Sequence, residues 1–167
     1  EFTTMLPFES GPAEWRRPGY VLTTARDRID PAAVLAAMRG EAYWVQNLPL
    51  WRFRRAIAGS LAFIVLAEGG DIAGFGRVIS DGATFAYIRD VFVVAAHRKR
   101  GLGRWIATCM VAHPDLAPVT NWTLATFDAH PLYAPLGFEV APPGKFMQRW
   151  VADEVANASA FADGEDA

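Results

Sequence analysis

The amino-acid sequence predicts a mixed α+β domain with a mostly antiparallel central sheet and helices on its flanks. Two apolar runs joined by a Gly69-Gly70-Asp71 turn come first, which is the pattern of a β-hairpin, and strand–helix units follow them. A composition that is 52% hydrophobic and 20% charged suits one compact domain with a real core. We expect this domain to span residues 5–150, with residues 1–4 a cloning remnant and residues 151–167 an acidic, alanine-rich tail.

The first half of the domain is expected to be mainly helical. Residues 20–24 form a short strand candidate. Asp30 then precedes a helical pattern whose first position is Pro31, where proline is well tolerated. Residues 43–58 carry aromatic and aliphatic side chains at helical spacing, which predicts a second helix. Arginines near its end suit the helix dipole, and Gly59 ends it.

The second half is expected to supply most of the sheet. Its strand candidates are residues 61–67, 72–79, 85–94, 122–127 and 146–150. Its helix candidates are residues 104–112 and 131–136. Because parallel strands need a crossover connection, we expect a parallel strand pair across the 104–112 helix.

The loop before that helix reads HRKRGLGRWI and places four cationic side chains around two glycines. A glycine-rich turn at a helix start gathers unpaired backbone N–H groups at the positive end of the helix dipole, which is a cradle for an anion. Gly101 and Gly103 let the backbone approach such an anion closely. The spacing matches neither a Walker loop nor G-x-G-x-x-G. The alternative interpretation is a solvated basic turn.

The residues around the loop favour the cradle. The stretch VFVVAAHRKRGLGRWIA resembles the acetyl-CoA-binding signature Q/R-x-x-G-x-G/A of the GNAT superfamily of N-acetyltransferases, with Arg98, Gly101 and Gly103 on its fixed positions. About 30 residues on, the segment AHPLYAPLGF resembles the A-x-x-L-Y-x-x-x-G-F segment of the same family. One departure is Thr126, which stands where many members carry asparagine.

This resemblance implies a GNAT-type sheet, with its parallel strand pair around the coenzyme-binding helix, and an N-acetyltransferase activity. The pyrophosphate of acetyl-CoA would lie on the loop amides, and the pantetheine arm would run beside a strand edge. The residues implied in coenzyme binding are Val91, Phe92, Val93, Arg98, Lys99, Arg100, Gly101, Leu102, Gly103 and Arg104. An amine would attack the thioester directly in a ternary complex, and Tyr133 would protonate the leaving thiolate. The alternative for Tyr133 is a core aromatic with a satisfied hydroxyl.

Two charges interrupt the apolar strand FAYIRDVFVV. Alternation puts Ile88, Asp90 and Phe92 on one face of it, and Arg89 on the other. Asp90 is the candidate catalytic base, acting through water; alternatively it holds a cationic substrate or pairs with Arg52, Arg54 or Arg55. Arg89 is either a structural ion-pair partner or a ligand for a substrate carboxylate.

The acceptor pocket is expected to involve the first half of the chain. Its candidate residues are Tyr43, Trp44, Phe75, Tyr87, Arg89 and His130. Aromatic side chains at such spacing also suit a core, and His130 also suits a helix cap or the surface. The three histidines lie far apart without cysteine or carboxylate at ligand spacing, so we predict no metal.

Three classes of function follow. The leading one is acetyl transfer from acetyl-CoA to a small amine, with peptide or protein amines as an alternative acceptor. The second is a non-catalytic relative that binds acyl-CoA or has a regulatory role. The third is a nucleic-acid-binding module. A net charge of −2 without a wider basic stripe disfavours nucleic acid. No apolar run is long enough to predict membrane insertion, and the single Cys109 favours the cytoplasm. The sequence leaves open whether the protein forms a homodimer.

Overall fold

The computed structural model describes residues 8, 10–41 and 45–153 of the 167-residue chain. Its six-stranded sheet runs in the order of the sequence, from β1 to β6. The strands are β1 (Glu14–Arg17), β2 (Tyr20–Thr23), β3 (Leu61–Ala67), β4 (Ile72–Ser80), β5 (Phe85–Val93) and β6 (Asn121–Leu124). The helices are α1 (Pro31–Glu41), α2 (Leu50–Ala58), α3 (Leu102–Val111) and α4 (His130–Tyr133).

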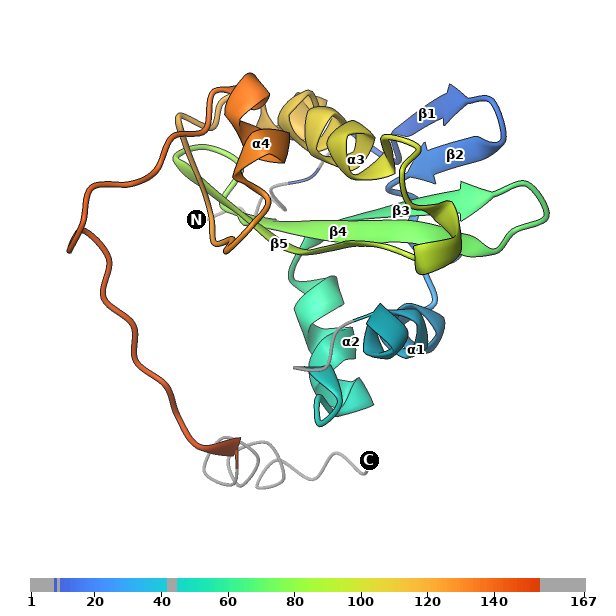
Figure 1. Cartoon of the computed structure of the whole chain (residues 1–167), viewed down its shortest axis with the longest axis horizontal. Helices are drawn as coiled ribbons and strands as arrows, with labels where there is room; N and C mark the ends of the chain where they lie inside the picture. The colour runs from blue at the N-terminus through green and yellow to red at the C-terminus, as the bar shows by residue number, and fades with distance from the viewer. Residues whose placement is uncertain (1–7, 9, 42–44, 154–167) are drawn as a thin grey trace, which may run out of the picture.

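The sheet is antiparallel from β1 to β5, and β6 then pairs with β5 in parallel. The β5–α3–β6 connection is thus the predicted parallel pair around a helix, and the α+β class is confirmed. The helices form two layers, with α3 and α4 on one face of the sheet and α1 and α2 on the other (Figure 1). Among the described residues, no helix is long and apolar enough to cross a membrane.

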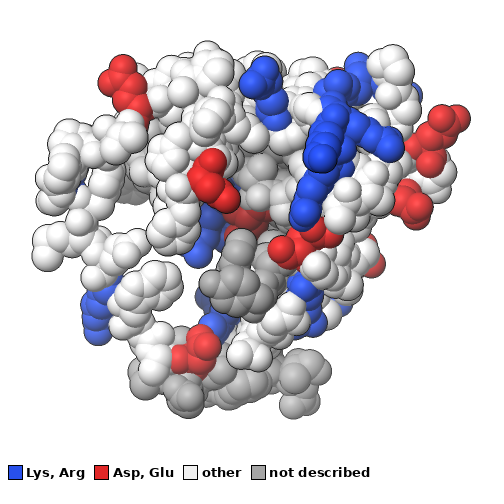
Figure 2. Space-filling model, viewed as in Figure 1, with Lys and Arg blue, Asp and Glu red and all other residues white. Residues whose placement is uncertain are grey.

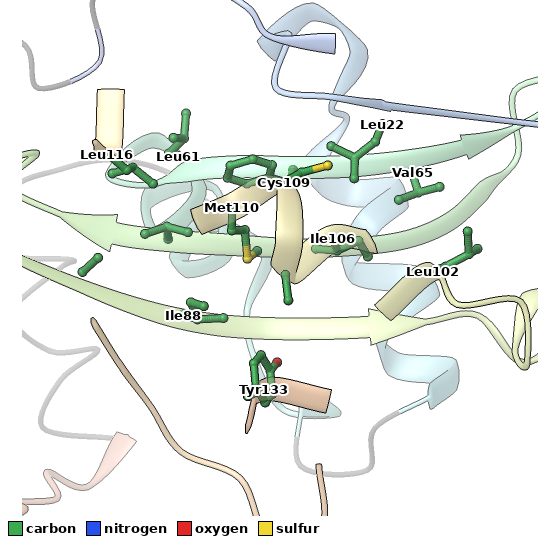
Figure 3. Close-up of a cluster of buried hydrophobic side chains, with 14 of the residues drawn as sticks. Leu22, Leu61, Val65, Ile88, Leu102, Ile106, Cys109, Met110, Leu116 and Tyr133 are labelled. Carbon is green, nitrogen blue, oxygen red and sulfur yellow. The ribbon is translucent and has the colours of Figure 1, made fainter. Parts of the chain in front are cut away.

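Each face of the sheet has its own core. Alternation along β3 directs Leu61, Phe63 and Val65 toward α3, whereas Ala62 and Ile64 face α1 and α2. The α3-side core contains Leu22, Leu61, Phe63, Val65, Ala73, Val78, Ala86, Ile88, Leu102, Ile106, Ala107, Cys109, Met110, Leu116 and Tyr133. Part of it is drawn in Figure 3. Because β3 is buried on both faces, its sequence is a continuous apolar run.

Two glycines of β4 let α3 lie close to the sheet. A β-carbon on Gly76 would lie 2.5 Å from the terminal methyl of Met110, and one on Gly74 would lie 3.1 Å from a methyl of Ile106. Real β-carbons essentially never approach other atoms to within 3.0 Å. The GFG run of β4 therefore determines the distance between α3 and the sheet, and with it the position of the loop that leads into the helix.

Three expectations about the elements need correction. The sequence predicts no strand at β1, because EWRR carries no apolar alternation; in the structure these residues are mostly exposed. The helix expected over residues 43–58 begins only at Leu50, after Pro49 in an extended conformation. Proline disfavours helical backbone at the residue before it, which prevents a continuous helix here. Tyr43 and Trp44 lie outside the described residues.

The last strand, expected over residues 146–150, is wrong. The chain from Glu139 to Val151 is extended or turning, is exposed throughout, and pairs with no strand of the sheet among the described residues. Figure 1 shows it leaving the body beyond α4. Aromatic composition favours a strand, but only a neighbouring strand can satisfy its backbone hydrogen bonds.

Candidate active site

The basic loop lies between a 3-10 turn at Ala95–His97 and the first turn of α3. Lys99 and Gly101 adopt left-handed backbone with φ of 62° and 73°. Gly101 is the N-cap of α3, and its carbonyl accepts the first helical hydrogen bond from the Trp105 amide at 3.0 Å. The first amides of an α-helix have no intrahelical partner, so this turn presents donors at the positive end of the α3 dipole.

Arg98 fastens the loop to two other elements. Its Nε donates to the Val93 carbonyl at 3.2 Å, and its Nη2 forms an ion pair with Glu41 at the end of α1. Glu41 also accepts a hydrogen bond from the Ala95 amide at 3.0 Å. One carboxylate therefore holds the entrance of the loop at two points. Sequence reasoning missed Glu41 because it lies more than 50 residues away from its partners.

The β1–β2 hairpin supports the loop from the other side. Arg17 donates to the Arg100 carbonyl at 3.1 Å, and its guanidinium lies 5.2 Å from the Trp105 ring centroid. Arg100 in turn donates to the Tyr20 hydroxyl at 2.7 Å, and this hydroxyl also forms a hydrogen bond with Nδ1 of His97, 3.0 Å away. Arg17 and Tyr20 are further residues of this region that the sequence did not reveal.

A cavity of about 430 Å³ joins the loop to the start of α4. It is lined by Val93, His97, Arg98, Lys99, Gly101, Leu102, Gly103, Arg104, Pro131 and Leu132. Most of the residues expected to bind coenzyme thus surround one hollow. Figure 2 shows lysine and arginine side chains gathered on this side of the molecule. A β-carbon on Gly103 would lie 3.1 Å from Leu132, so this glycine lets α4 approach α3.

The edge of β5 is open beside this cavity. β6 pairs with β5 only from Phe85 to Ile88, and the described structure shows no partner on that side of residues 89–93. Val91, Phe92 and Val93, expected to contact the coenzyme, lie on this open half. An extended ligand can add to such an edge as an extra strand.

A β-bulge begins the open half. Phe75 is opposite Phe92 and Arg77 is opposite Arg89, so Asp90 and Val91 together face Gly76. Asp90 is the extra residue, with φ of 55°. The bulge reverses the alternation, so that Ile88 lies in the α3-side core whereas Phe92 packs on the opposite face. The expectation that both share one face is therefore wrong.

The Asp90 carboxylate pairs with Arg77 and not with Arg52, Arg54 or Arg55, the ion-pair partners that the sequence left open as one alternative. Arg77 Nε lies 2.5 Å from Oδ2 of Asp90, and both side chains are largely buried. Arg77 Nη1 also donates to Ser60 Oγ at 3.0 Å. Among the described residues no donor binds Oδ1 of Asp90, so that oxygen is open to a water or a substrate.

Tyr133 lies on α4 and contributes to the α3-side core (Figure 3). Its ring meets that of Phe138 edge-on, with centroids 5.8 Å apart. Burial raises the pKa of its hydroxyl above the ordinary value near 10, so the group stays protonated at neutral pH. No protein partner of the hydroxyl is found in the described part of the chain.

Thr126 accepts a hydrogen bond from the Ala129 amide at 2.9 Å, which supports the turn before α4.

The other acceptor candidates are scattered. Phe75 is fully buried between Phe53 and Phe92, with centroid distances of 6.3 and 6.1 Å, so it is a core residue. Tyr87 is half-buried under the exposed Arg89, whose guanidinium carbon lies 6.0 Å from the ring centroid. His130 is exposed at the first position of α4. The described residues contain no group of three or more His, Cys, Asp and Glu side chains placed to hold a metal.

Comparison with known proteins identifies the same architecture elsewhere. Residues 59–140 match the family model of the acetyltransferase (GNAT) domain. A crystal structure of a candidate acetyltransferase of the GNAT family from Xanthomonas campestris pv. campestris superimposes with a TM-score of 0.74 and 38% identity, over 81% of this chain and 96% of that one. A structure from Clostridium acetobutylicum, described as a predicted acetyltransferase with acetyl-CoA, has a TM-score of 0.59 at 14% identity, over 78% and 94% of the two chains.

A curated fungal relative is similar over a shorter length. It is a candidate acetyltransferase from Gibberella zeae, 26% identical over 113 residues. That match covers 57% of this chain and 64% of the fungal protein, so the chain spans less than two thirds of the relative's length.

Proposed function

This chain belongs to the GNAT family of acetyltransferases, and on that premise we propose that it transfers the acetyl group of acetyl-CoA to the amine of a small molecule, by direct attack in a ternary complex. The observation that carries the proposal is the cavity of about 430 Å³ between the basic loop and α4. Its volume lies within the range of roughly 300–1,000 Å³ that is typical of small-molecule sites.

The cavity and the strand edge beside it suit two parts of the coenzyme, its pyrophosphate and its pantetheine arm. Phosphate oxygens need amide donors and cations, which the start of α3, Lys99 and Arg104 supply. Arg98 is already paired with Glu41, so we assign it the positioning of the loop, with its free donors turned to phosphate. The pantetheine arm carries amide groups, and the open edge of β5 beside Val93 offers backbone partners for them.

Tyr133 is the proposed general acid. The thioester supplies an activated acyl group and leaves a thiolate, which needs a proton near neutral pH. Burial raises the pKa of the Tyr133 hydroxyl, so at neutral pH the group carries its proton and can donate it to the sulfur as the C–S bond breaks. Leu132, the residue before Tyr133, lines the cavity, which supports this role because α4 borders the proposed coenzyme site.

A proton must also leave the acceptor amine. An alkylamine with a pKa of about 10.4 is neutral in only about one molecule in 10³ at pH 7. We propose that Asp90 accepts this proton through a water on Oδ1, while Arg77 fixes the carboxylate through Oδ2. The bulge supports this role because it turns Asp90 out of the strand ladder at the point where β6 separates from β5.

We further propose that residues 5–150 make up this one domain and that the protein works in the cytoplasm. The family match at residues 59–140 lies inside that range. Cys109 is free and buried, which suits a reducing compartment.

The test is release of free thiol from acetyl-CoA across a library of polyamines, amino acids, aminoglycosides and short peptides. We expect turnover with one or more small amines. Turnover with peptide N-termini alone would reassign the acceptor class. Tight binding of acetyl-CoA by calorimetry without turnover of any amine would favour the non-catalytic alternative.

A further inference from the structure

The bulge in β5 places two neighbouring charges on the same face of the sheet. Arg89 is directly opposite Arg77 of β4, and directly opposite residues of an antiparallel pair share a face. The carboxylate of Asp90 reaches the same Arg77 side chain, which also donates to Ser60 just after α2. Arg89 and Asp90 therefore both face the side of α1 and α2, whereas strand alternation predicted opposite faces for them.

These charges leave one cation without a counter-charge. Arg77 and Asp90 form a largely buried ion pair, whereas Arg89 is exposed and forms no ion pair with any carboxylate of the described residues. Like charges directly opposite each other in a sheet destabilise it, so Arg89 lies beside Arg77 at an electrostatic cost. An anion on Arg89 would offset that cost, and the planar guanidinium matches the geometry of a carboxylate.

Tyr87 orients the Arg89 side chain. The two residues are two positions apart on β5, so they lie on one face of the strand. The guanidinium carbon of Arg89 lies 6.0 Å from the ring centroid of Tyr87, within reach of a cation–π contact. The guanidinium thus leans toward Tyr87 and away from Asp90. The positive and negative groups are separated along the strand and do not neutralise each other.

Both charges lie where β5 loses its β6 neighbour. β6 pairs with β5 as far as Ile88, so Arg89 and Asp90 are the first two residues of the open half. The proposed path of the pantetheine arm follows this edge, and Asp90 is the proposed base for the acceptor amine. A group bound by Arg89 therefore belongs to the molecule whose amine approaches Asp90.

We propose that the acceptor is an amino acid, with its amine at Oδ1 of Asp90 and its carboxylate on Arg89. This inference rests on the proposed acetyl transfer and narrows its acceptor class. Arg77 occupies Oδ2 of Asp90, which leaves Oδ1 for the amine or its water. A polyamine or an aminoglycoside carries further cationic groups in place of the carboxylate, and Arg89 would repel them.

The reaction then has a defined proton balance. The amine nitrogen bonds to the acetyl carbon, and the C–S bond breaks. The ammonium form gives up two protons. One passes through water to Asp90 and then to solvent, and the other replaces the proton that Tyr133 gives to the sulfur. The products are the N-acetyl amino acid, free CoA and one proton.

The first experiment compares matched acceptors by release of free thiol from acetyl-CoA. The pairs are valine and valinamide, phenylalanine and phenylalaninamide, and γ-aminobutyrate and its amide, with putrescine as a dication. Each amide keeps the size of its acid and removes the negative charge. We expect kcat/KM to be at least about tenfold higher for the acid in one pair or more, as for a charge-assisted hydrogen bond. The amide's amine is the less basic one, so basicity does not explain such a preference.

The second experiment removes the cation. Arg89→Gln should lower the acid-to-amide ratio of kcat/KM by about 10–100-fold, chiefly through KM for the acid, because the carboxylate contact exists before the transition state. Arg89→Lys should restore part of the ratio, since it keeps the charge and loses the planar fork. Arg28→Gln, which changes an exposed arginine just beyond β2, three strands from β5, should keep the parent ratio.

Calorimetric binding of the same amino acids to the chain loaded with CoA separates this proposal from acetyl transfer. Amino-acid binding that Arg89→Gln abolishes, without turnover of any amine, would support the site and overturn the proposed function. Equal turnover of acids and amides, preference for putrescine, or equal loss of acids and amides in Arg89→Gln would overturn the amino-acid acceptor and leave acetyl transfer standing. Amino acids that neither bind nor react would overturn it as well.

Discussion

At the scale of single residues, substitution of Tyr133 distinguishes an enzyme from a protein that only binds acetyl-CoA. Tyr133→Phe keeps the ring that packs against Phe138 and removes only the hydroxyl. If that hydroxyl protonates the thiolate, kcat and kcat/KM should fall together. General acid catalysis contributes about 10²–10⁴ in rate, and we expect the lower end because a thiolate is already a fair leaving group.

The control for Tyr133→Phe is the affinity of the same sample for acetyl-CoA, measured by calorimetry, together with its melting temperature. Both should stay close to those of the parent chain. An unchanged single-turnover rate in a folded variant would remove Tyr133 from the catalytic residues. Proton delivery would then fall to His130 or to water.

His113 gives a second residue-scale prediction, about stability. Its side chain is buried against Trp15 and Phe63, where Nδ1 accepts from the Asp115 amide and Nε2 has no partner among the described residues. Burial lowers its pKa below the ordinary value near 6.5, although the Asp115 charge opposes this. The unfolded chain thus binds a proton more readily than the folded one, so His113 lowers the free energy of unfolding as pH falls below about 6.5.

Urea unfolding at pH 5.0 and pH 7.5 measures this effect. The parent chain should be less stable at the lower pH, and His113→Leu should lose less stability over the same interval, since it has no group to charge. Equal pH dependence in the two chains would show that other groups cause the acid sensitivity.

The residues that sequence reasoning missed share one physical feature. Glu41, Arg17 and Arg77 act through partners that are distant in sequence, across 57, 83 and 13 positions respectively. The motifs predicted the loop and Tyr133 because those residues are defined by local spacing. Ion pairs depend on which elements the fold places together, and no local pattern contains that information.

At the scale of elements, the seating of α3 on β4 is the feature to test. Gly76→Val would place branched carbon where the Met110 methyl and a Val91 methyl already lie. Overpacking of this kind costs about 1–3 kcal/mol of unfolding free energy. Because α3 would move outward with its N-terminus, we also expect weaker acetyl-CoA binding.

Gly40→Ala is the matched control for Gly76→Val. Gly40 lies in α1 with no atom within 4 Å of a built β-carbon. Alanine there should stabilise the chain by about 0.5–1 kcal/mol, because glycine is the poorer helix former. Urea denaturation of both variants checks the pair, and a neutral Gly76→Val would show that α3 is free to shift.

The elements also show the limits of sequence patterns. Strands β3, β4 and β5 were predicted closely, because long apolar runs separated by glycine turns allow few alternatives. The sequence did not predict the bulge at Asp90. One extra residue in β5 leaves the strand as apolar as before, but it moves every later side chain to the opposite face of the sheet. The failed strand at residues 146–150 has the pattern of a strand and lacks the partner.

At the scale of the whole molecule, charge is distributed unevenly. The chain has a net charge of −2, yet the loop and the hairpin place Arg17, Lys99, Arg100 and Arg104 on one side. Such a local positive field attracts a polyanionic small molecule without making the surface as a whole basic. This distribution fits a coenzyme with clustered phosphates better than a long nucleic acid.

Affinity for acetyl-CoA should therefore fall with ionic strength, by roughly tenfold between 50 and 500 mM NaCl, because salt screens exposed charges. A Lys99→Gln, Arg104→Gln double variant should bind more weakly at low salt and show a flatter salt dependence. Arg54→Gln, which removes an exposed arginine from α2 on the other face of the sheet, should behave like the parent chain. Calorimetric titrations at three salt concentrations give the salt dependence of affinity for all three chains. Duplex DNA measured in the same buffers should bind weakly throughout.

A parent affinity that does not change with salt would mean that the coenzyme is held by backbone amides and apolar contacts alone. The cations of the loop would then have only the structural contacts seen for Arg98 and Arg100.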